Sequence, residues 1–319
     1  MVVSSVVRSS HQGESHGGVY LVDLETDAVR QVLDWNDPSI SWEGRGLDRG
    51  LRGIAFHEGH VYLAASDEIF VYDPQFRQSG CFRSRYLKHC HEIFIDGDLL
   101  YATSTGFDSV LVYDLTNGSW VRGYCLRFGR LAKRCRRLRL RPRPRFSVFA
   151  PSSDDGPPPG DSTHINNVFV EAAVAFVCGT GLGTVWAIQD HGSGPPKLFR
   201  HATVPYGSHN ARPHRHGVLL NHTATDRIAH VDRRGHVLGE FPLVHYSEAD
   251  LQHASLTSDV ARQAFGRGLA VIDDELFVGG SSPATVTVYR FGQREPVKSI
   301  NLTMDVRNSV HGLEVWPFA

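Results

Sequence analysis

A short β-pattern recurs along the sequence at intervals of about 40 residues, and this repetition constrains the fold more than any other feature. Each copy holds two β-runs joined by a tight turn and a third run that ends in a triplet like Val-Tyr-Asp. Alternating Val, Ile, Tyr and Phe predict strands, and Glu58-Gly59 and Asp96-Gly97 suit tight hairpins. Three clear copies and two looser ones are Arg52–Pro74, His91–Leu115, Arg267–Arg290, His164–Asp190 and His209–Asp232.

A fourth run follows most copies, which gives five four-stranded units. The sixth unit is split between the two ends of the chain: Val310–Trp316 resembles a first strand, and Val2–Arg8, Gly18–Leu24 and Ala28–Asp34 resemble the other three. Pairing the C-terminal strand with the N-terminal strands would close a ring and leave no free sheet edge. We therefore predict an all-β fold, a single six-bladed β-propeller domain over residues 1–319. The alternative is another all-β fold, such as two sandwiches.

The rest of the composition limits the function classes. A formal net charge of -1 argues against a chain-wide attraction to nucleic acid or anionic membranes. No apolar run is long enough for a secretion signal or a membrane span. Five cysteines without a CxxC pair indicate a reducing compartment, so we expect a cytoplasmic protein without a membrane partner. Ser247–Gln263 is the one helix candidate.

Residues 128–162 are predicted to form a basic, Pro-rich insertion between units three and four. Within it, Arg130–Arg145 carries nine basic residues and no acidic one. Such composition favours a mobile, solvated loop. The alternative is a polybasic arm for RNA or anionic surfaces, but no aromatic residues interleave the charges for base stacking.

Histidine or arginine opens the first strand of every unit. In a propeller this strand lines the central channel, and its start lies near one face, so one residue per unit converges on the axis. His89 competes with His91 for this place in unit three. The six opening residues are Arg52, His91, His164, His209, Arg267 and His311.

Residues of these types in one small volume predict a metal site with an anionic substrate beside it. Neutral imidazole is the commonest transition-metal ligand, and guanidinium grips carboxylate or phosphate in a bidentate way. The alternative for each residue alone is structural, as a cap on backbone carbonyls. The predicted metal ligands are His91, His164, His209 and His311, and Arg52 and Arg267 would bind the substrate.

Four further residues complete the predicted site. Glu92, adjacent to His91, would serve as a general base or as a hydrogen-bond partner of a ligand. His214 would transfer protons, unless it is only a turn residue. Asn210 and Arg212 follow a ring position and would contact the substrate.

The Arg-Gly-Leu-Ala and His-Gly-Leu openings and the Val-Tyr-Asp strand ends resemble the six-bladed propellers that include the gluconolactonase-like hydrolases. The resemblance covers the repeat. Those enzymes hold a divalent ion with Glu, Asn and Asp, and their usual Glu-Gly-Pro opening is absent here. An all-histidine axial site is similar instead to the iron centre of carotenoid-cleaving oxygenases or to the histidine-rich sites of some propeller lyases, as a likeness of site type only.

The sequence thus predicts a metal-dependent enzyme for a small anionic substrate, with a non-haem Fe(II) oxidoreductase or oxygenase favoured. Neutral nitrogen ligands also suit Zn, Mn or Cu. One alternative is a metal-dependent lyase or hydrolase at the same site. Another is a non-catalytic propeller that binds a protein or, through residues 130–145, a nucleic acid.

Overall fold

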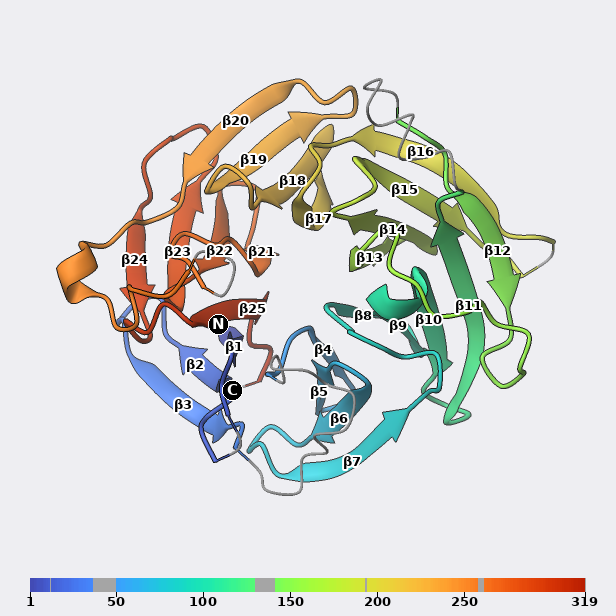
Figure 1. The fold of residues 1–319 in the computed structure, drawn as a ribbon, viewed down its shortest axis with the longest axis horizontal. Coiled ribbons are helices and arrows are strands. Elements are labelled where there is room, and N and C mark those ends of the chain that lie inside the picture. Colours follow the sequence, from blue (N-terminus) through green and yellow to red (C-terminus); the bar gives the residue numbers. More distant parts are fainter. Residues whose placement is uncertain (12, 37–49, 130–140, 193, 258–260, 319) are drawn as a thin grey trace.

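The computed structural model describes residues 1–11, 13–36, 50–129, 141–192, 194–257 and 261–318. Six antiparallel sheets surround a central axis, and this arrangement confirms the predicted six-bladed β-propeller (Figure 1). The described residues contain no α-helix: of the helix candidate, Glu248–Asp250 forms one 3-10 turn. None of the described helical segments has the length and apolar character needed to cross a membrane.

Within each blade, the strands are given in spatial order from the axis outward. Blade 1 consists of β25 (Asn308–Glu314), β1 (Val2–Val7), β2 (Gly18–Val22) and β3 (Val29–Asp34). Blade 2 consists of β4 (Ile54–His57), β5 (His60–Ala65), β6 (Glu68–Tyr72) and β7 (Gln78–Arg83). Blade 3 has five strands: β8 (Ile93–Asp96), β9 (Leu99–Ser104), β10 (Ser109–Asp114), β11 (Ser119–Arg127) and β12 (Arg145–Phe149).

The other three blades have four strands each. Blade 4 consists of β13 (Ile165–Glu171), β14 (Val174–Gly179), β15 (Thr184–Gln189) and β16 (Lys197–Thr203). Blade 5 consists of β17 (Ser208–His214), β18 (Gly217–His222), β19 (Arg227–Asp232) and β20 (Val237–Pro242). Blade 6 consists of β21 (Leu269–Val271), β22 (Leu276–Ser281), β23 (Thr285–Arg290) and β24 (Lys298–Asn301).

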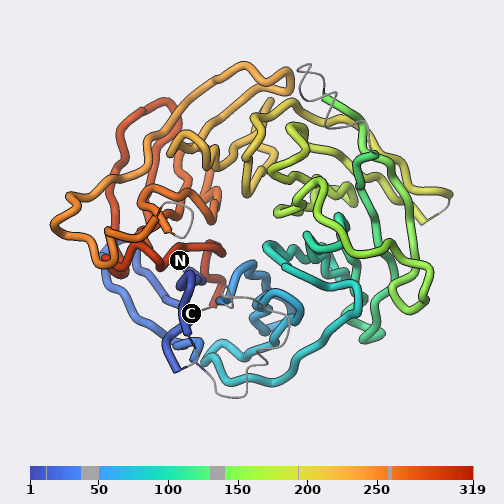
Figure 2. Tube along the Cα trace, in the orientation of Figure 1, coloured from blue at the N-terminus to red at the C-terminus, as the bar shows by residue number. Residues whose placement is uncertain are grey.

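Blade 1 closes the ring as the sequence predicts. β1 pairs antiparallel with β25, from Val2 opposite Glu314 to Val7 opposite Asn308. Figure 2 shows the two ends of the chain beside each other in this blade. Because the closing strands share backbone hydrogen bonds, the inner strand of blade 1 has a partner like every other inner strand.

The second half of the expected insertion does not lie free of the sheets, which corrects that part of the prediction. β12 pairs with β11, from Gly123 opposite Phe149 to Arg127 opposite Arg145. Just before it, the Arg143 guanidinium donates to the carbonyl of Leu198 in blade 4 at 3.0 Å. Residues 130–140 lie outside the described residues.

The hydrophobic core is divided among the blade interfaces. Each of six clusters of buried side chains joins two neighbouring blades, and none spans the axis. Between blades 3 and 4, for example, Leu126 packs with Ile165 and Trp186. The apolar faces of the strands therefore stabilise the ring, and the axis is left to polar side chains.

The glycines of the Arg-Gly and His-Gly openings lie where inner strands of neighbouring blades meet. A Cβ on Gly312 of blade 1 would overlap the carbonyl oxygen of Arg52 in blade 2. A Cβ on Gly53 would come within 2.5 Å of the amide nitrogen of Ile93 in blade 3. The motif is thus explained by close backbone approach around the axis.

Candidate functional site

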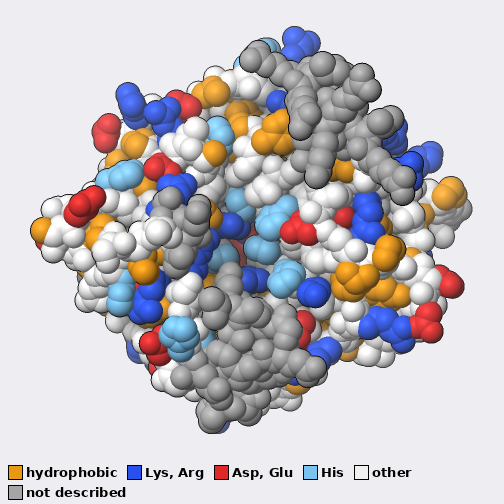
Figure 3. Space-filling model, viewed as in Figure 1, with side chains coloured by type: hydrophobic (Ala, Val, Ile, Leu, Met, Phe, Trp, Pro, Cys, Tyr) orange, Lys and Arg blue, Asp and Glu red, His pale blue; other side chains and the backbone are white. Residues whose placement is uncertain are grey.

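The structure brings the six opening residues together at one end of the channel. The imidazole ring centroids of His91 and His164 are 5.5 Å apart, and those of His91 and His311 are 6.4 Å apart. His209 lies close enough to His164 and His311 to interact with them electrostatically. Figure 3 shows histidine and basic side chains gathered around the hollow at the centre of this face.

The six opening residues form a ring around the axis, and most of them lie below the molecular surface. His209 and His311 are 4% and 6% exposed, and Arg52 and Arg267 are also buried. His91 and His164 remain partly exposed. A ligand that enters from this face therefore meets His91 and His164 first and the buried residues behind them.

Hydrogen bonds at Nδ1 determine the tautomer of two imidazoles, those of His91 and His209. His91 Nδ1 lies 2.8 Å from the carbonyl oxygen of His89, and His209 Nδ1 lies 3.1 Å from that of Gly207. A carbonyl only accepts, so Nδ1 carries the hydrogen in both rings and, in the neutral ring, Nε2 carries a lone pair. His89 therefore serves through its backbone, while the ring of His91 meets the other histidines.

His164 is oriented by a side chain instead. Its Nδ1 lies 2.8 Å from Oδ2 of Asp161, which precedes the strand. A carboxylate–imidazole pair of this kind directs the other nitrogen away from the carboxylate. Asp161 was not among the predicted site residues.

Burial and positive charge keep three of the histidines neutral. The pKa values of His91, His209 and His311 lie well below the ordinary value, first because the protein around each imidazole, including the partly exposed one of His91, penalises the charged form, and next because arginines are near. Arg52 and Arg267 act on His91 and His311, and Arg267 acts on His209. The imidazoles are therefore available as lone-pair donors at neutral pH.

The four imidazoles are suitable ligands for a transition metal, although they are not arranged as a complete coordination sphere. With metal–nitrogen bonds of about 2.1 Å, ring centroids of two ligands of one ion lie roughly 4.6 to 6.5 Å apart, which includes both separations given above. Nε2 of His209 and of His311 is buried and has no hydrogen-bond partner among the described residues. Within those same residues, no three His, Cys, Asp or Glu side chains are yet spaced to hold a metal ion. The rings would have to close in on a bound ion.

A second polar layer lies in the channel beside this ring. Asn210 Nδ2 donates to Oε2 of Glu92 at 3.0 Å, and the Arg212 guanidinium donates to the Glu314 carboxylate. Asn221 supports the layer by donating to Oδ1 of Asn210 at 3.1 Å. Asn210 and Arg212, which the sequence assigned to the substrate, are thus engaged with carboxylates of the protein.

Glu92 is held in its protonated form by its surroundings. Burial raises its pKa to about 8, and Arg212 opposes this shift while Glu314 adds to it. Burial likewise raises the pKa of Glu314. Two carboxyl groups therefore share one guanidinium in a place where full ionisation of both is costly.

His214 lies away from the ring, at the opposite end of β17 from His209. Its ring stacks on Phe291 with centroids 4.4 Å apart and an interplanar angle of 7°. His230 lies beside both, with ring centroids 5.7 Å from His214. The structure therefore does not bring His214 into reach of an axial substrate, in contrast to the predicted proton-transfer role.

Arg8 joins the site although the sequence analysis did not select it. Its charge helps to lower the pKa of His311 and His209, and its guanidinium carbon lies 4.1 Å from the ring centroid of Phe265. Arg267 lies 4.8 Å from the same centroid. Arg8 directly follows β1, the second strand of blade 1, so an alignment of first strands alone cannot find it.

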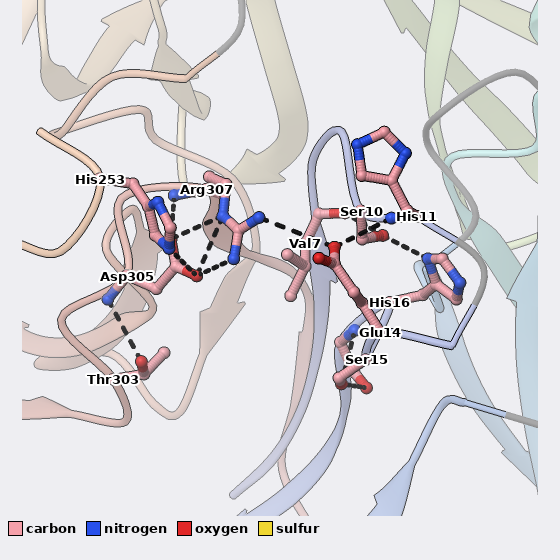
Figure 4. Close-up of polar contacts among 11 residues, drawn as sticks. Val7, Ser10, His11, Glu14, Ser15, His16, His253, Thr303, Asp305 and Arg307 are labelled. Atoms are coloured by element: carbon pink, nitrogen blue, oxygen red, sulfur yellow. Dashed lines mark hydrogen bonds and ion pairs between the residues drawn. The ribbon is translucent and has the colours of Figure 1, made fainter. Parts of the chain in front are cut away.

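The segment from Val7 to His16 is tied to the connection between β24 and β25 (Figure 4). The amide of Arg8 donates to the carbonyl of Arg307 at 3.0 Å. The Arg307 guanidinium in turn contacts Asp305 at 2.8 Å and Glu14 at 3.9 Å. This network fixes the chain on both sides of the ring closure and so helps to position Arg8.

Comparisons with known proteins give no family. No protein-family model matches the sequence, and no curated protein matches it. Among solved structures, a streptogramin B lyase is similar over 77% of this chain and 70% of its own, with 11% sequence identity and a TM-score of 0.41. The class of protein is defined by its own structure, as a six-bladed β-propeller whose axis carries four histidines and two arginines.

Proposed function

We propose that this protein is a transition-metal-dependent enzyme that acts on a small anionic substrate at the histidine–arginine ring on its axis. The observation that supports this most is the orientation of the imidazoles. His91 and His209 engage Nδ1 with backbone carbonyls, which is the usual arrangement of metal-ligating histidines. Nε2 of His209 and of His311 is buried without a hydrogen-bond partner among the described residues, as expected for a nitrogen whose lone pair is free to bind a metal ion.

His91, His164, His209 and His311 would hold the metal. Four imidazole nitrogen donors suit Fe(II), the metal that we favour, with Zn, Mn and Cu as alternatives. When bound, such an ion supplies a Lewis acid, and in the case of iron or copper a redox centre, at an open coordination position. A dioxygen-dependent oxidoreductase is the favoured reaction type, and a lyase or hydrolase is the alternative for Zn or Mn.

The arginines would select and orient the substrate. Guanidinium binds carboxylate or phosphate through two parallel hydrogen bonds. Arg52 and Arg267 also repel a cation, because like charges at short range interact unfavourably. An anionic substrate offsets this repulsion, so the metal and the substrate should bind cooperatively.

Elemental analysis of the purified protein tests the proposal. Wild type should carry about one transition metal per chain after anaerobic reconstitution with Fe(II), Zn, Mn or Cu, and His209→Ala and His311→Ala should lose it while circular dichroism shows an intact fold. His60→Ala, an exposed histidine at the start of β5, should keep the metal. A wild type that takes up none of these metals would refute the metal-dependent function. Dependence of turnover on dioxygen then separates the oxidoreductase from the lyase or hydrolase.

A further inference from the structure

We propose that Thr105 and Thr223 are positioning residues that fix the tautomer and orientation of His91 and His209. Each threonine hydroxyl accepts at Nδ1 of one imidazole, beside the backbone carbonyl that also accepts there, and so helps to present Nε2 to the axis. The inference rests on the proposed function for its purpose, because a fixed Nε2 lone pair serves a metal ion. The hydrogen bonds from which we draw the inference form in the protein without a metal ion.

The arrangement in blade 3 forms a chain of three groups. His91 Nδ1 lies 3.0 Å from the Thr105 hydroxyl oxygen. The Thr105 hydroxyl donates its own hydrogen to the carbonyl of Ile165, which belongs to the inner strand of blade 4. A hydroxyl has one hydrogen, so the same oxygen can only accept from Nδ1. The threonine thereby favours the Nδ1–H tautomer and links the ring to the next blade.

Blade 5 repeats this arrangement. His209 Nδ1 lies 2.7 Å from the Thr223 hydroxyl oxygen. The Thr223 hydroxyl donates to the carbonyl of Gly266 at 3.4 Å, and Gly266 leads into the inner strand of blade 6. Thr105 and Thr223 are 1% and 5% exposed, so water hardly competes for these bonds. Two blades that are not neighbours in the ring thus give a histidine the same hydrogen-bond partner.

The position of the threonine is a feature of the repeat. In blades 2 to 6 a hydroxyl residue directly follows the second strand. In blade 4 this residue is Thr180, but there His164 takes Asp161 as its Nδ1 partner. The sequence pattern is therefore general, whereas the contact with a histidine belongs to blades 3 and 5. The five residues are Ser66, Thr105, Thr180, Thr223 and Ser282.

Nitrogen chemical shifts of the histidine side chains, measured on metal-free protein, test the inference directly. In wild type, His91 and His209 should both show the Nδ1–H tautomer. Thr105→Val keeps the shape and removes the hydroxyl, so the tautomer ratio of His91 should shift by about fivefold, the effect of one hydrogen bond. Thr223→Val should do the same for His209, Thr105→Ser and Thr223→Ser should restore the ratios, and Thr180→Val should change neither.

Zinc titration by competition with a chelator gives the second measurement. Each valine variant should bind Zn(II) roughly 10 to 100-fold more weakly, as loss of a ligand's hydrogen-bond partner does, and the serine variants should recover. An Nε2–H tautomer in wild type, or unchanged tautomer ratios in folded valine variants, would overturn the positioning role. Shifted tautomers in a protein that binds no metal would leave the positioning role standing and refute the metal-dependent function. If the valine variants do not fold, Thr105→Ala and Thr223→Ala, which also lack the hydroxyl, replace them in both measurements.

Discussion

Arg212 of blade 5 donates a hydrogen bond to the Glu314 carboxylate of blade 1, and this ion pair joins two inner strands that are not neighbours in the ring. The two side chains are 10% and 25% exposed. The pair therefore connects two non-adjacent blades through the channel, in addition to the apolar interfaces between adjacent blades. Glu92 of blade 3 interacts with both charges, so three blades meet in one polar layer.

Removal of Arg212 should destabilise the fold strongly. Arg212→Met leaves the buried Glu92 and the partly buried Glu314 without their guanidinium, which should lower the free energy of unfolding by about 3 kcal/mol in urea denaturation. Glu314→Gln should cost about 1 kcal/mol, since an amide oxygen still accepts. The double variant should lose less than the sum of the two. Arg227→Met, in the exposed pair with Glu240, should lie within about 1 kcal/mol of wild type. Additive effects of the Arg212 and Glu314 changes would contradict a coupled pair.

Stability should fall as pH rises through the titration of Glu92. Its pKa is about 8 in the folded protein against 4.5 ordinarily, so the native state holds a proton that the unfolded state has released. The stabilisation is complete below pH 4.5 and is lost as pH rises through 8, with a slope of up to about 1.4 kcal/mol per pH unit. Glu92→Gln stays neutral and should lack this slope. Urea unfolding of metal-free wild type and variant across this range measures the difference, and equal slopes would exclude a protonated Glu92.

The buried histidines should have the opposite effect on stability, which they should lower as the pH falls below neutral. The folded-state pKa of His311 is well below its ordinary value of 6.5, so the unfolded state binds more protons below that pH. Their stabilisation is complete above pH 6.5 and is lost as pH falls. His311→Asn should therefore lose less stability than wild type between pH 7 and pH 5, by up to about 1.4 kcal/mol per pH unit. A larger loss in His311→Asn would mean that the histidine is charged in the folded protein.

A methyl group on Gly312 should disturb the axial site without touching a ligand. Gly312→Ala forces the inner strands of blades 1 and 2 apart, because its Cβ would meet the carbonyl of Arg52. We expect a loss of about 3 kcal/mol in unfolding free energy together with weaker metal binding. Gly80→Ala is the matched control in outer strand β7, where a Cβ would meet only the Cβ of Val71 at 4.0 Å. Equal behaviour of the two variants would show that the inner strands tolerate separation.

The strands were predictable because their signals are local. Alternation and tight turns place Val2–Arg8 and Gly18–Leu24 within two residues of the bounds of β1 and β2, and they pair the two ends of the chain correctly. β12 was missed because arginine and proline around it hide the alternation that marks a strand. Its existence depends on the free edge of β11, which is a tertiary feature.

The site was predictable only in part, because irregular inner strands decide where side chains point. The register of β17 against β18 shifts between His209 and Arg212, and Asn210 has a φ of 48°. A shift of one residue reverses the face that a side chain occupies, so the roles of Asn210 and Arg212 could not be derived from spacing. Arg8 and the threonines directly follow second strands, and their part in the site depends on how the blades assemble.

The pairing of β1 with β25 has a consequence for how the protein acquires activity during synthesis. Ser4 accepts a hydrogen bond from the amide of Gly312, 308 positions later, beside His311. Blades 2 to 6 can assemble in order as they leave the ribosome, whereas β1 can complete its pairing only after β25 has been made. Contacts of such separation form late because their loop-closure entropy is large. A nascent or truncated chain would therefore be an open arc without His311, and ligand binding would mark the moment at which the ring is complete.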